Sequence, residues 1–353
     1  MSRVQAPTID DLAAHLGVHK STVSRAMDPA RRHMISAPML QRVEAAAREL
    51  GYRPNLAAAT LSTGRSRTVG VLLPDITNPV FPPILRGIED ALDARGYFAL
   101  LANTARRDNA AQQAVQRMQQ QRVEGFIIAS ATRDDGWLEG LRKTGATIVL
   151  VNRTDGRAAL PAVISDDAIG MQLAVDHLVA LGHRRIAHLA GPAALSTGLA
   201  RHQGFERALV AHGLTPAGIV ECAAYSIDGG ATAMRALLDA VGRAQRSRAR
   251  AGASAAFTAV AAANDLIALG ALQVLRERGI AVPQVLSIVG HNDIPLLDQI
   301  SPPLTTVRIQ HYQMGFRAAQ LLLDALDGSP GSEMATVMLR PELVVRGSTA
   351  APP

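Results

Sequence analysis

Three short stretches in the first 51 residues place apolar side chains at the spacing of one helical face. The pattern predicts helices from residue 9 to 16, from about 19 to 27 and from about 36 to 50. Thr8 and Asp11 have the sequence of an N-terminal capping box, and Gly17 and Gly51 are stop signals for the first and third helices. The apolar faces consist of Ile9, Leu12, Ala13 and Leu16, of Thr22, Val23 and Ala26, and of Leu40, Val43, Ala47 and Leu50. Two short helices joined at a glycine, the second with outward polar and basic side chains, predict a helix-turn-helix.

Beyond residue 67 the chain alternates short apolar runs with stretches of helical spacing. The runs begin near residues 69, 98, 126, 147, 186, 258 and 285, and segments such as 81–96 separate them. Strands that alternate with helices predict an α/β core with parallel sheets covered on both faces. The segment 242–256, which contains four arginines, interrupts the alternation and is expected to be a solvated surface loop.

Polar residues that follow these strands are the candidate ligand contacts, because parallel α/β sheets bind ligands beyond the carboxyl ends of their strands. The candidates are Asp75, Asn78, Phe81, Ser130, Asn152, Arg153, Asn264, Asn292 and Asp293. Arg201 joins them because it lies just before a helix expected to begin near Gln203. Carboxylates, amides and guanidinium groups around one cleft suit a small polyhydroxylated or anionic molecule. A cap or a loop contact is the alternative for each of these residues. Asp265 is interpreted as a helix cap, and a structural role for Asp293 stays open.

Composition narrows the class of protein. A chain of 353 residues suggests two or three domains, and 48% hydrophobic with 19% charged residues allows a sizeable core. The single cysteine, Cys222, excludes an internal disulfide framework and a multi-cysteine metal site. The first residues lack the apolar stretch of a signal peptide, and no apolar run is long enough to span a bilayer. We therefore expect a soluble, cytoplasmic protein with no membrane partner.

The excess positive charge lies at the N-terminus. The formal net charge is +6, and residues 1–67 carry ten basic and five acidic side chains, whereas the other 286 residues contribute only +1. A basic module on a nearly neutral body is typical of a nucleic-acid-binding protein. A merely solvated basic end is the alternative.

The runs LGVHKSTVSRAM (16–27) and ELGYRPN (49–55) resemble the DNA-binding domain of the lactose-repressor (LacI/GalR) family. The resemblance implies DNA contacts from residues of the second helix, namely His19, Lys20 and Ser21 to base edges and Thr22, Ser24 and Arg25 to phosphates and bases. Readout of the major groove also requires long polar side chains on the first turn of a helix, on physical grounds alone. A solvated helix face is the alternative for any one of them.

Residues 54–67 resemble the hinge helix and linker of the same family. In that family the hinge helix orders on DNA and inserts a leucine from each of two protomers into the minor groove, where apolar wedges kink the duplex. By resemblance Leu61 takes the leucine position, and Asn55 and Ala58 lie close to the DNA. Ordinary packing on the core is the alternative for Leu61.

The resemblance extends over residues 68–347, through runs such as RTVGVLLPDITNPVF (67–81) and ARHQGFERAL (200–209). It implies an effector-binding and dimerisation core after a helix-turn-helix domain at 1–53, with the fold of periplasmic sugar-binding proteins and three crossovers between two lobes. The expected division gives lobe 1 about 68–164 and 295–327, and lobe 2 about 165–294 and 328–347.

One motif departs from the family pattern and bears on the effector. Arg201 matches an arginine that commonly grips the effector in the family, whereas His291 and Asn292 replace an aromatic residue and an aspartate of the VG[YF]DD motif. Exchange of a carboxylate for an amide removes a charge and adds a donor. It argues against simple transfer of neutral-hexose specificity and is compatible with an anionic effector held by Arg201 and Arg153.

These features together predict a sequence-specific transcriptional repressor. No nucleotide-binding glycine motif occurs, no base accompanies Cys222, and His183 and His188 are interpreted as structural, so no enzyme activity, catalytic residue, metal or cofactor is expected. The expected partners are a pseudo-palindromic double-stranded DNA operator, a small-molecule effector (a sugar, sugar acid or related metabolite) and a second copy of the chain, with a tetramer left open. The alternatives are an effector-dependent activator, a regulator that requires a corepressor, and a cytoplasmic small-molecule-binding protein without specific operator recognition.

Overall fold

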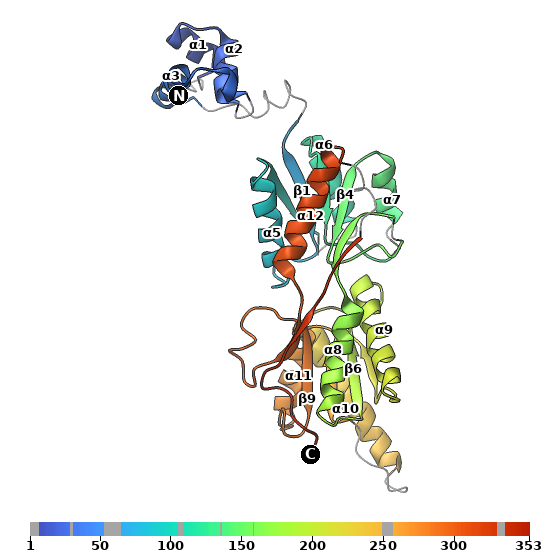
Figure 1. Ribbon diagram of the computed structural model, residues 1–353. Coiled ribbons are helices and arrows are strands. Elements are labelled where there is room, and N and C mark those ends of the chain that lie inside the picture. The colour runs from blue at the N-terminus through green and yellow to red at the C-terminus, as the bar shows by residue number, and fades with distance from the viewer. Residues whose placement is uncertain are drawn as a thin grey trace, which may run out of the picture. The chain divides into compact units, whose positions relative to one another are not determined.

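The computed structural model describes residues 7–28, 31–52, 65–104, 109–134, 136–157, 159–248, 257–329 and 336–353 (Figure 1). The chain divides into two compact units, Met1–Ser66 and Arg67–Pro353. Each unit has a hydrophobic core of its own.

The described residues of the first unit form three short α-helices, as the apolar spacing predicted. They are α1 (Ile9–Leu16), α2 (Lys20–Met27) and α3 (Ala37–Leu50), and a 3-10 turn, η1 (Arg32–Met34), lies between α2 and α3. Leu12, Val23 and Val43 are fully buried, one from each helix, and alanines fill the remaining core positions. The core is small, so each of these three side chains forms a large part of it.

The ends of α1 confirm the caps expected from the sequence. Thr8 N donates to the Asp11 carboxylate at 2.8 Å, and Asp11 N donates to Thr8 Oγ1 at 3.3 Å, which completes the capping box. Gly17 and Gly51 adopt φ values of +66° and +67° after α1 and α3, a conformation that costs other residues more. Local chemistry therefore sets both ends of α1 and the C-terminal end of α3.

Two six-stranded sheets form the second unit, and each sheet defines one lobe (Figure 1). The sheet of lobe 1 contains, in spatial order, β11 (Thr336–Leu339), β5 (Ala162–Ser165), β4 (Thr147–Val151), β3 (Gly125–Ile128), β1 (Thr68–Leu73) and β2 (Phe98–Asn103). The sheet of lobe 2 contains β12 (Glu342–Val344), β10 (Thr305–Arg308), β9 (Ser287–Asn292), β8 (Ala259–Ala262), β6 (Ile186–Ala190) and β7 (Ile219–Glu221). All neighbouring strands are parallel except β10 and β12. The predicted parallel α/β sheets are confirmed, with one antiparallel strand added at an edge.

Helices cover both faces of each sheet, which explains why strands such as β3, β6 and β8 are buried throughout. In lobe 1 the two faces are covered by α5 (Phe81–Asp93) with α12 (His311–Leu326), and by α6 (Ala110–Gln120) with α7 (Gly136–Lys143). In lobe 2 they are covered by α8 (Asp167–Ala180) with α9 (Ser196–Ala211), and by α10 (Ile227–Arg248) with α11 (Asp265–Glu277). Over the described residues, none of the helices has the length and apolar character needed to cross a membrane.

The path of the chain corrects three expectations. Residues 295–308 were placed in lobe 1, but β10 pairs with β9 in lobe 2. Residues 328–347 are expected in lobe 2, and β12 does pair with β10 there, but β11 pairs with β5 in lobe 1. The segment expected to be a loop from residue 242 is helical through Arg248, as the end of α10. A short apolar run predicts a strand but contains no information on which sheet it joins, whereas the order of strands is set by contacts between distant parts of the chain.

The chain therefore crosses between the lobes three times, after β5, between β10 and α12, and between β11 and β12. The three crossovers were expected.

Candidate functional site

Helix α2 presents a polar face on the first unit. Val23 and Ala26 anchor the helix in the core, and His19, Lys20, Ser24 and Arg25 are exposed. Ser21 and Thr22 are half-buried. The predicted DNA contacts Asn55, Ala58 and Leu61 lie outside the described residues.

His19 fixes the start of this face. Its Nδ1 accepts from Ser21 N at 3.2 Å and lies 2.8 Å from Ser21 Oγ, so His19 caps α2, which starts at Lys20, one residue later than expected. Lys20 Nζ is 4.0 Å from Asp10 Oδ1, but both side chains are about two-thirds exposed, and such a pair contributes little. The ammonium group of Lys20 therefore remains available to a partner.

A cavity lies between the two lobes of the second unit. Its empty volume is about 270 Å³, part of it open to solvent, and most of that space is too narrow to hold a water molecule. The lining residues from lobe 1 are Asn78, Val80, Phe81, Asn152 and Arg153, and those from lobe 2 are Thr197, Arg201, Tyr225, Asn264 and Asn292. The lobes are thus nearly closed on each other, and a ligand larger than water requires them to separate. Seven of these ten residues were predicted ligand contacts.

Arg201 is held in the cavity wall by three hydrogen bonds. It lies inside α9, not just before a helix as expected, and is 3% exposed. Its Nε donates to Asp167 Oδ1 at 2.8 Å, one terminal nitrogen donates to Ala263 O at 2.7 Å, and the other donates to Asn292 Oδ1 at 3.1 Å. Burial raises the pKa of Asp167, an effect that the adjacent Arg201 opposes. Arg201 and Asp167 therefore form a buried ion pair whose polar atoms are largely satisfied by protein.

Arg153 lies on the opposite wall and differs from Arg201 in its partners. It is 9% exposed, its Nε is buried without a hydrogen-bond partner, and its guanidinium makes no hydrogen bond or ion pair with any described residue. Its Cζ lies 6.0 Å from the centre of the Tyr225 ring, and that of Arg201 lies 5.8 Å from the same centre. The Tyr225 hydroxyl donates to Thr197 Oγ1 at 3.2 Å, which fixes the ring between the two cations.

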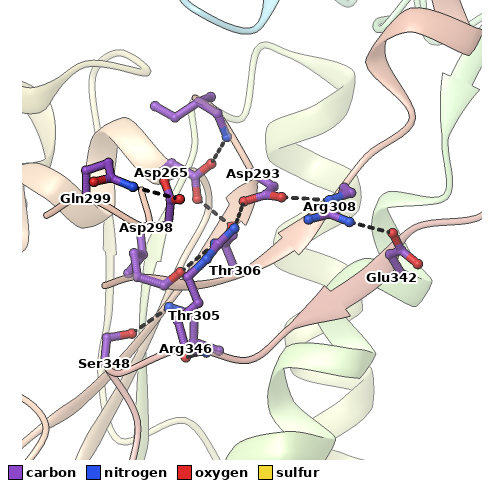
Figure 2. A network of polar contacts seen from close by, with 12 residues as sticks. Asp265, Asp293, Asp298, Gln299, Thr305, Thr306, Arg308, Glu342, Arg346 and Ser348 are labelled. Atoms are coloured by element: carbon purple, nitrogen blue, oxygen red, sulfur yellow. Dashed lines mark hydrogen bonds and ion pairs between the residues drawn. The ribbon is translucent and has the colours of Figure 1, made fainter. Parts of the chain in front are cut away.

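Three predicted ligand contacts do not line the cavity. Asp293 accepts from Arg308 Nε at 2.7 Å and is bridged by Arg346 at 2.8 Å, so both carboxylate oxygens are occupied within lobe 2 (Figure 2). Asp75 accepts from Thr77 N and from the Thr77 hydroxyl in the loop after β1. Ser130 follows β3 as expected, but it is not among the lining residues. For Asp293 the structural alternative is thus the one that the contacts support.

Comparison with known proteins decides the family. Residues 8–55 match the family described as bacterial regulatory proteins, lacI family, and residues 175–349 match a periplasmic binding protein-like domain. The HTH-type transcriptional regulator MalR of Streptomyces coelicolor is 35% identical to this chain over 353 residues, which cover 97% of this chain and 96% of the relative. The chain belongs to the LacI family.

Solved structures of LacI-family proteins share the fold along nearly the whole chain. The lac repressor dimer bound to operator and the anti-inducer ONPF superposes with a TM-score of 0.85 at 28% identity, covering 98% of this chain and 100% of that one. The transcriptional regulator CelR in complex with cellobiose superposes with a TM-score of 0.72 at 31% identity, covering 97% and 99%. The Lac repressor-like architecture is therefore confirmed.

Sequence reasoning missed three lining residues of this LacI-family cavity, namely Val80, Thr197 and Tyr225. Tyr225 follows β7, a strand of three residues that is half exposed and too short for its pattern to be recognised. Thr197 is the second residue of α9, whose start the sequence pattern placed too late, near Gln203. Val80 immediately precedes Phe81, which was predicted.

The titratable groups that were interpreted as structural are buried outside the cavity. His183 Nδ1 lies 2.9 Å from Thr258 Oγ1, and His188 Nδ1 lies 2.8 Å from Ala261 O. Burial lowers the pKa of His188 to about 4 and raises the pKa of Cys222 to about 12. Both groups are therefore neutral at physiological pH, which agrees with the structural interpretation.

Asp265 is a core residue of lobe 2 and not the helix cap that was expected. Asn264 is the cap, since its Oδ1 accepts from Ile267 N at 2.9 Å. Asp265 is fully buried, and Ile294 N and the Thr306 hydroxyl donate to its carboxylate (Figure 2). Burial raises the pKa of Asp265 to about 7.

We expect Asp265 to make the second unit less stable as the pH rises from 5 to 8. Its folded-state pKa of about 7 lies above the unfolded value of 3.8, so the stability due to its protonated form is lost as the pH rises through 7. Asp265→Asn, which cannot ionise, should therefore gain roughly 2 kcal/mol in unfolding free energy relative to the unmodified protein between pH 5 and 8. Urea denaturation at several pH values measures the difference, with the exposed Asp298→Asn as control. Parallel pH curves for Asp265→Asn and the unmodified protein would contradict the expectation.

Proposed function

We propose that this LacI-family chain is a cytoplasmic transcriptional repressor without enzymatic activity, which binds a pseudo-palindromic operator as a homodimer. A sugar, sugar acid or related metabolite held between the lobes controls that binding. The observation that carries the proposal is the presence, in one chain, of an exposed polar helix on a small three-helix unit and a polar cavity between two lobes. Each of these features alone fits many proteins, whereas the two together fit a DNA-binding regulator with a ligand-binding core.

The exposed face of α2 supplies the groups that read DNA in this proposal. His19, Lys20 and Ser21 lie at the first turn, where a helix inserted in the major groove meets base edges, and Arg25 lies one turn further on. Thr22 and Ser24 add hydroxyl groups for phosphates and bases. Asn55, Ala58 and Leu61 remain proposed contacts of the hinge on the minor groove.

The cavity between the lobes is the site through which a ligand controls operator binding in this proposal. Its walls belong to different lobes, so a ligand that contacts both walls favours one separation of the lobes over others. Because the coupling between ligand and operator is a free energy, it must be reciprocal: operator DNA changes the affinity for the ligand by the same factor. The relatives support this assignment, since the lac repressor is seen as a dimer on its operator and CelR is seen with cellobiose.

Fluorescence anisotropy on DNA from upstream of the protein's own gene tests operator recognition. We expect binding that survives an excess of random-sequence competitor and weakens steeply with salt. The matched comparison uses the same DNA with one half-site scrambled, which a two-fold symmetric dimer should bind much more weakly. Equal affinity for operator, half-scrambled and random DNA, with and without metabolite extract, would overturn the proposal.

Lys20→Ala is expected to weaken operator binding by roughly 10-fold, because a base contact from a lysine contributes about 1–3 kcal/mol of discrimination. Its side chain is 64% exposed, so the unfolding free energy should change little. The control is Lys143→Ala, which removes the other lysine of the chain from α7 in lobe 1. Anisotropy titrations of both variants measure the effect, and equal affinities would remove Lys20 from the interface.

A further inference from the structure

Arg153 is a buried cation without a counter-charge among the described residues. Desolvation lowers the pKa of its guanidinium, and the nearby Arg201 lowers it further, whereas Tyr225 and Asp167 oppose this shift. The centre of the Tyr225 ring lies 6.0 Å from its Cζ, and a ring quadrupole offsets only part of the cost of a desolvated cation. An arginine in this setting is costly unless something else binds it.

The other lining residues cannot neutralise Arg153. None of the ten residues around the cavity is acidic, and four of them are asparagines: Asn78, Asn152, Asn264 and Asn292. The carboxylate of Asp167, which favours the charge of Arg153 from a distance, binds Arg201 directly at 2.8 Å. The excess charge at the cavity is therefore positive and lies on Arg153.

We propose that the ligand of this cavity carries a carboxylate group and that the guanidinium of Arg153 binds it. This inference rests on the proposed function, in that it takes the cavity to be the effector site. Arginine presents a planar pair of donors that matches the two oxygens of a carboxylate. The ligand class is then a sugar acid or a hydroxy acid of about monosaccharide size, in keeping with the effector class proposed above, and the lobes separate to admit it.

The hydrogen-bonding character of the walls favours this ligand over a neutral sugar. Sugar hydroxyls bind best where carboxylates accept their protons, and this cavity offers none. The side-chain oxygens of Asn264 and Asn292 already accept from Ile267 N and Arg201, so the amide groups of these two residues face the cavity mainly as donors. A donor-rich wall with a free cation fits a ligand rich in acceptors.

Charge balance favours a carboxylate over a phosphate. The three nitrogens of Arg201 each bind protein atoms, so one unpaired guanidinium remains to neutralise the ligand. A carboxylate brings a single negative charge and leaves the closed site neutral. A phosphate monoester brings close to two negative charges and would leave one of them buried without a partner.

The test separates ligands by charge before their identity is known. A metabolite extract of the native cells is divided by anion exchange into neutral and anionic fractions, and each is added to the full-length protein on its operator. Thermal unfolding and release or tightening of operator are both recorded. In parallel, neutral hexoses and pentoses are compared with their aldonic acids, uronic acids and phosphate esters. We expect the anionic fraction to act, and the active compound to be a carboxylic acid of monosaccharide size.

Arg153→Met is the decisive variant, because methionine keeps much of the side-chain length without the charge. It should leave the ligand-free protein at least as stable as the unmodified one, since it removes an unpaired buried cation. It should weaken binding of the active acid by roughly 100-fold or more. Arg153→Lys should recover part of the affinity, and Arg207→Met, at an exposed arginine of α9, should bind as the unmodified protein does.

Three results would overturn the inference: activity in the neutral fraction or in no fraction, identification of the active compound as a phosphate ester, or unchanged affinity in Arg153→Met. Operator binding in the same samples separates these results from failure of the proposed function. If a neutral compound shifts operator affinity, the assignment as a regulator stands, but the proposal that the ligand carries a carboxylate fails. If the operator is not bound at all, both fail.

Discussion

Leu12→Ala is expected to abolish specific DNA binding while the second unit stays folded. Among the described residues of this core, Leu12, Val23 and Val43 are the fully buried side chains larger than alanine. Truncation of a buried leucine costs about 2–5 kcal/mol, and a unit of this size has little stability beyond that. Helix α2 takes its orientation from this core. Loss of the core should therefore lower operator affinity at least 100-fold, toward the affinity for non-specific DNA. Anisotropy with competitor DNA measures the loss.

The control for Leu12→Ala is Met34→Ala in the same unit. Met34 is 60% exposed, so its truncation should change neither stability nor operator affinity appreciably. The second unit has its own cores, and its thermal transition should be the same in both variants. Operator binding of Leu12→Ala at the affinity of the unmodified protein would show that α2 does not depend on this core.

Arg201→Met is expected to destabilise the second unit by about 3–5 kcal/mol, the cost of leaving a buried charge without its partner. The variant removes three hydrogen bonds and leaves the Asp167 carboxylate, 7% exposed, without the group that neutralises it. Asp167 must then either remain charged in the interior or take up a proton, and each costs free energy at pH 7. Chemical denaturation of the full chain, monitored at the second unit, measures the loss.

A double-mutant cycle with Asp167→Asn distinguishes the ion pair from simple packing. Because the double variant removes both charges, it should be more stable than the sum of the two single losses predicts, by about 1.5 kcal/mol or more. Additive losses would show that Arg201 contributes through its volume and not through its bond to Asp167. A loss below about 1 kcal/mol in Arg201→Met alone would contradict the role assigned to this pair.

The features that sequence predicted well are those with a local cause. The capping box of Thr8 and Asp11 and the turn at Gly17 each involve residues within a few positions of one another. Alternation of apolar runs with helices depends on the burial of both sheet faces, and central strands such as β3 and β8 are apolar for that reason. Arg153 and Asn152 were found because they follow β4 directly, where a parallel sheet must expose its ligand-binding edge.

The features that sequence missed depend on distant partners. Asp293 follows β9 as a ligand contact should, but its carboxylate forms ion pairs with Arg308 and Arg346. Nothing in the sequence near residue 293 predicts these two partners. Asn264 and Asp265 are adjacent and chemically alike as caps, and the choice between them is made by Thr306, 41 positions away. Strand β11 joins lobe 1 because β5 offers a free edge there, a property of the assembled sheet.

The late crossovers have a consequence for synthesis of the protein on the ribosome. Helix α12 covers one face of the lobe 1 sheet, and β11 forms its edge, yet both come from residues after 310. While the preceding residues are being translated, the apolar side chains that α12 will cover, such as Ile127 and Val149, lack part of their final packing. A nascent or prematurely terminated chain therefore displays hydrophobic surface from lobe 1 until residues 311–339 have been translated, and is a natural substrate for chaperones and proteases.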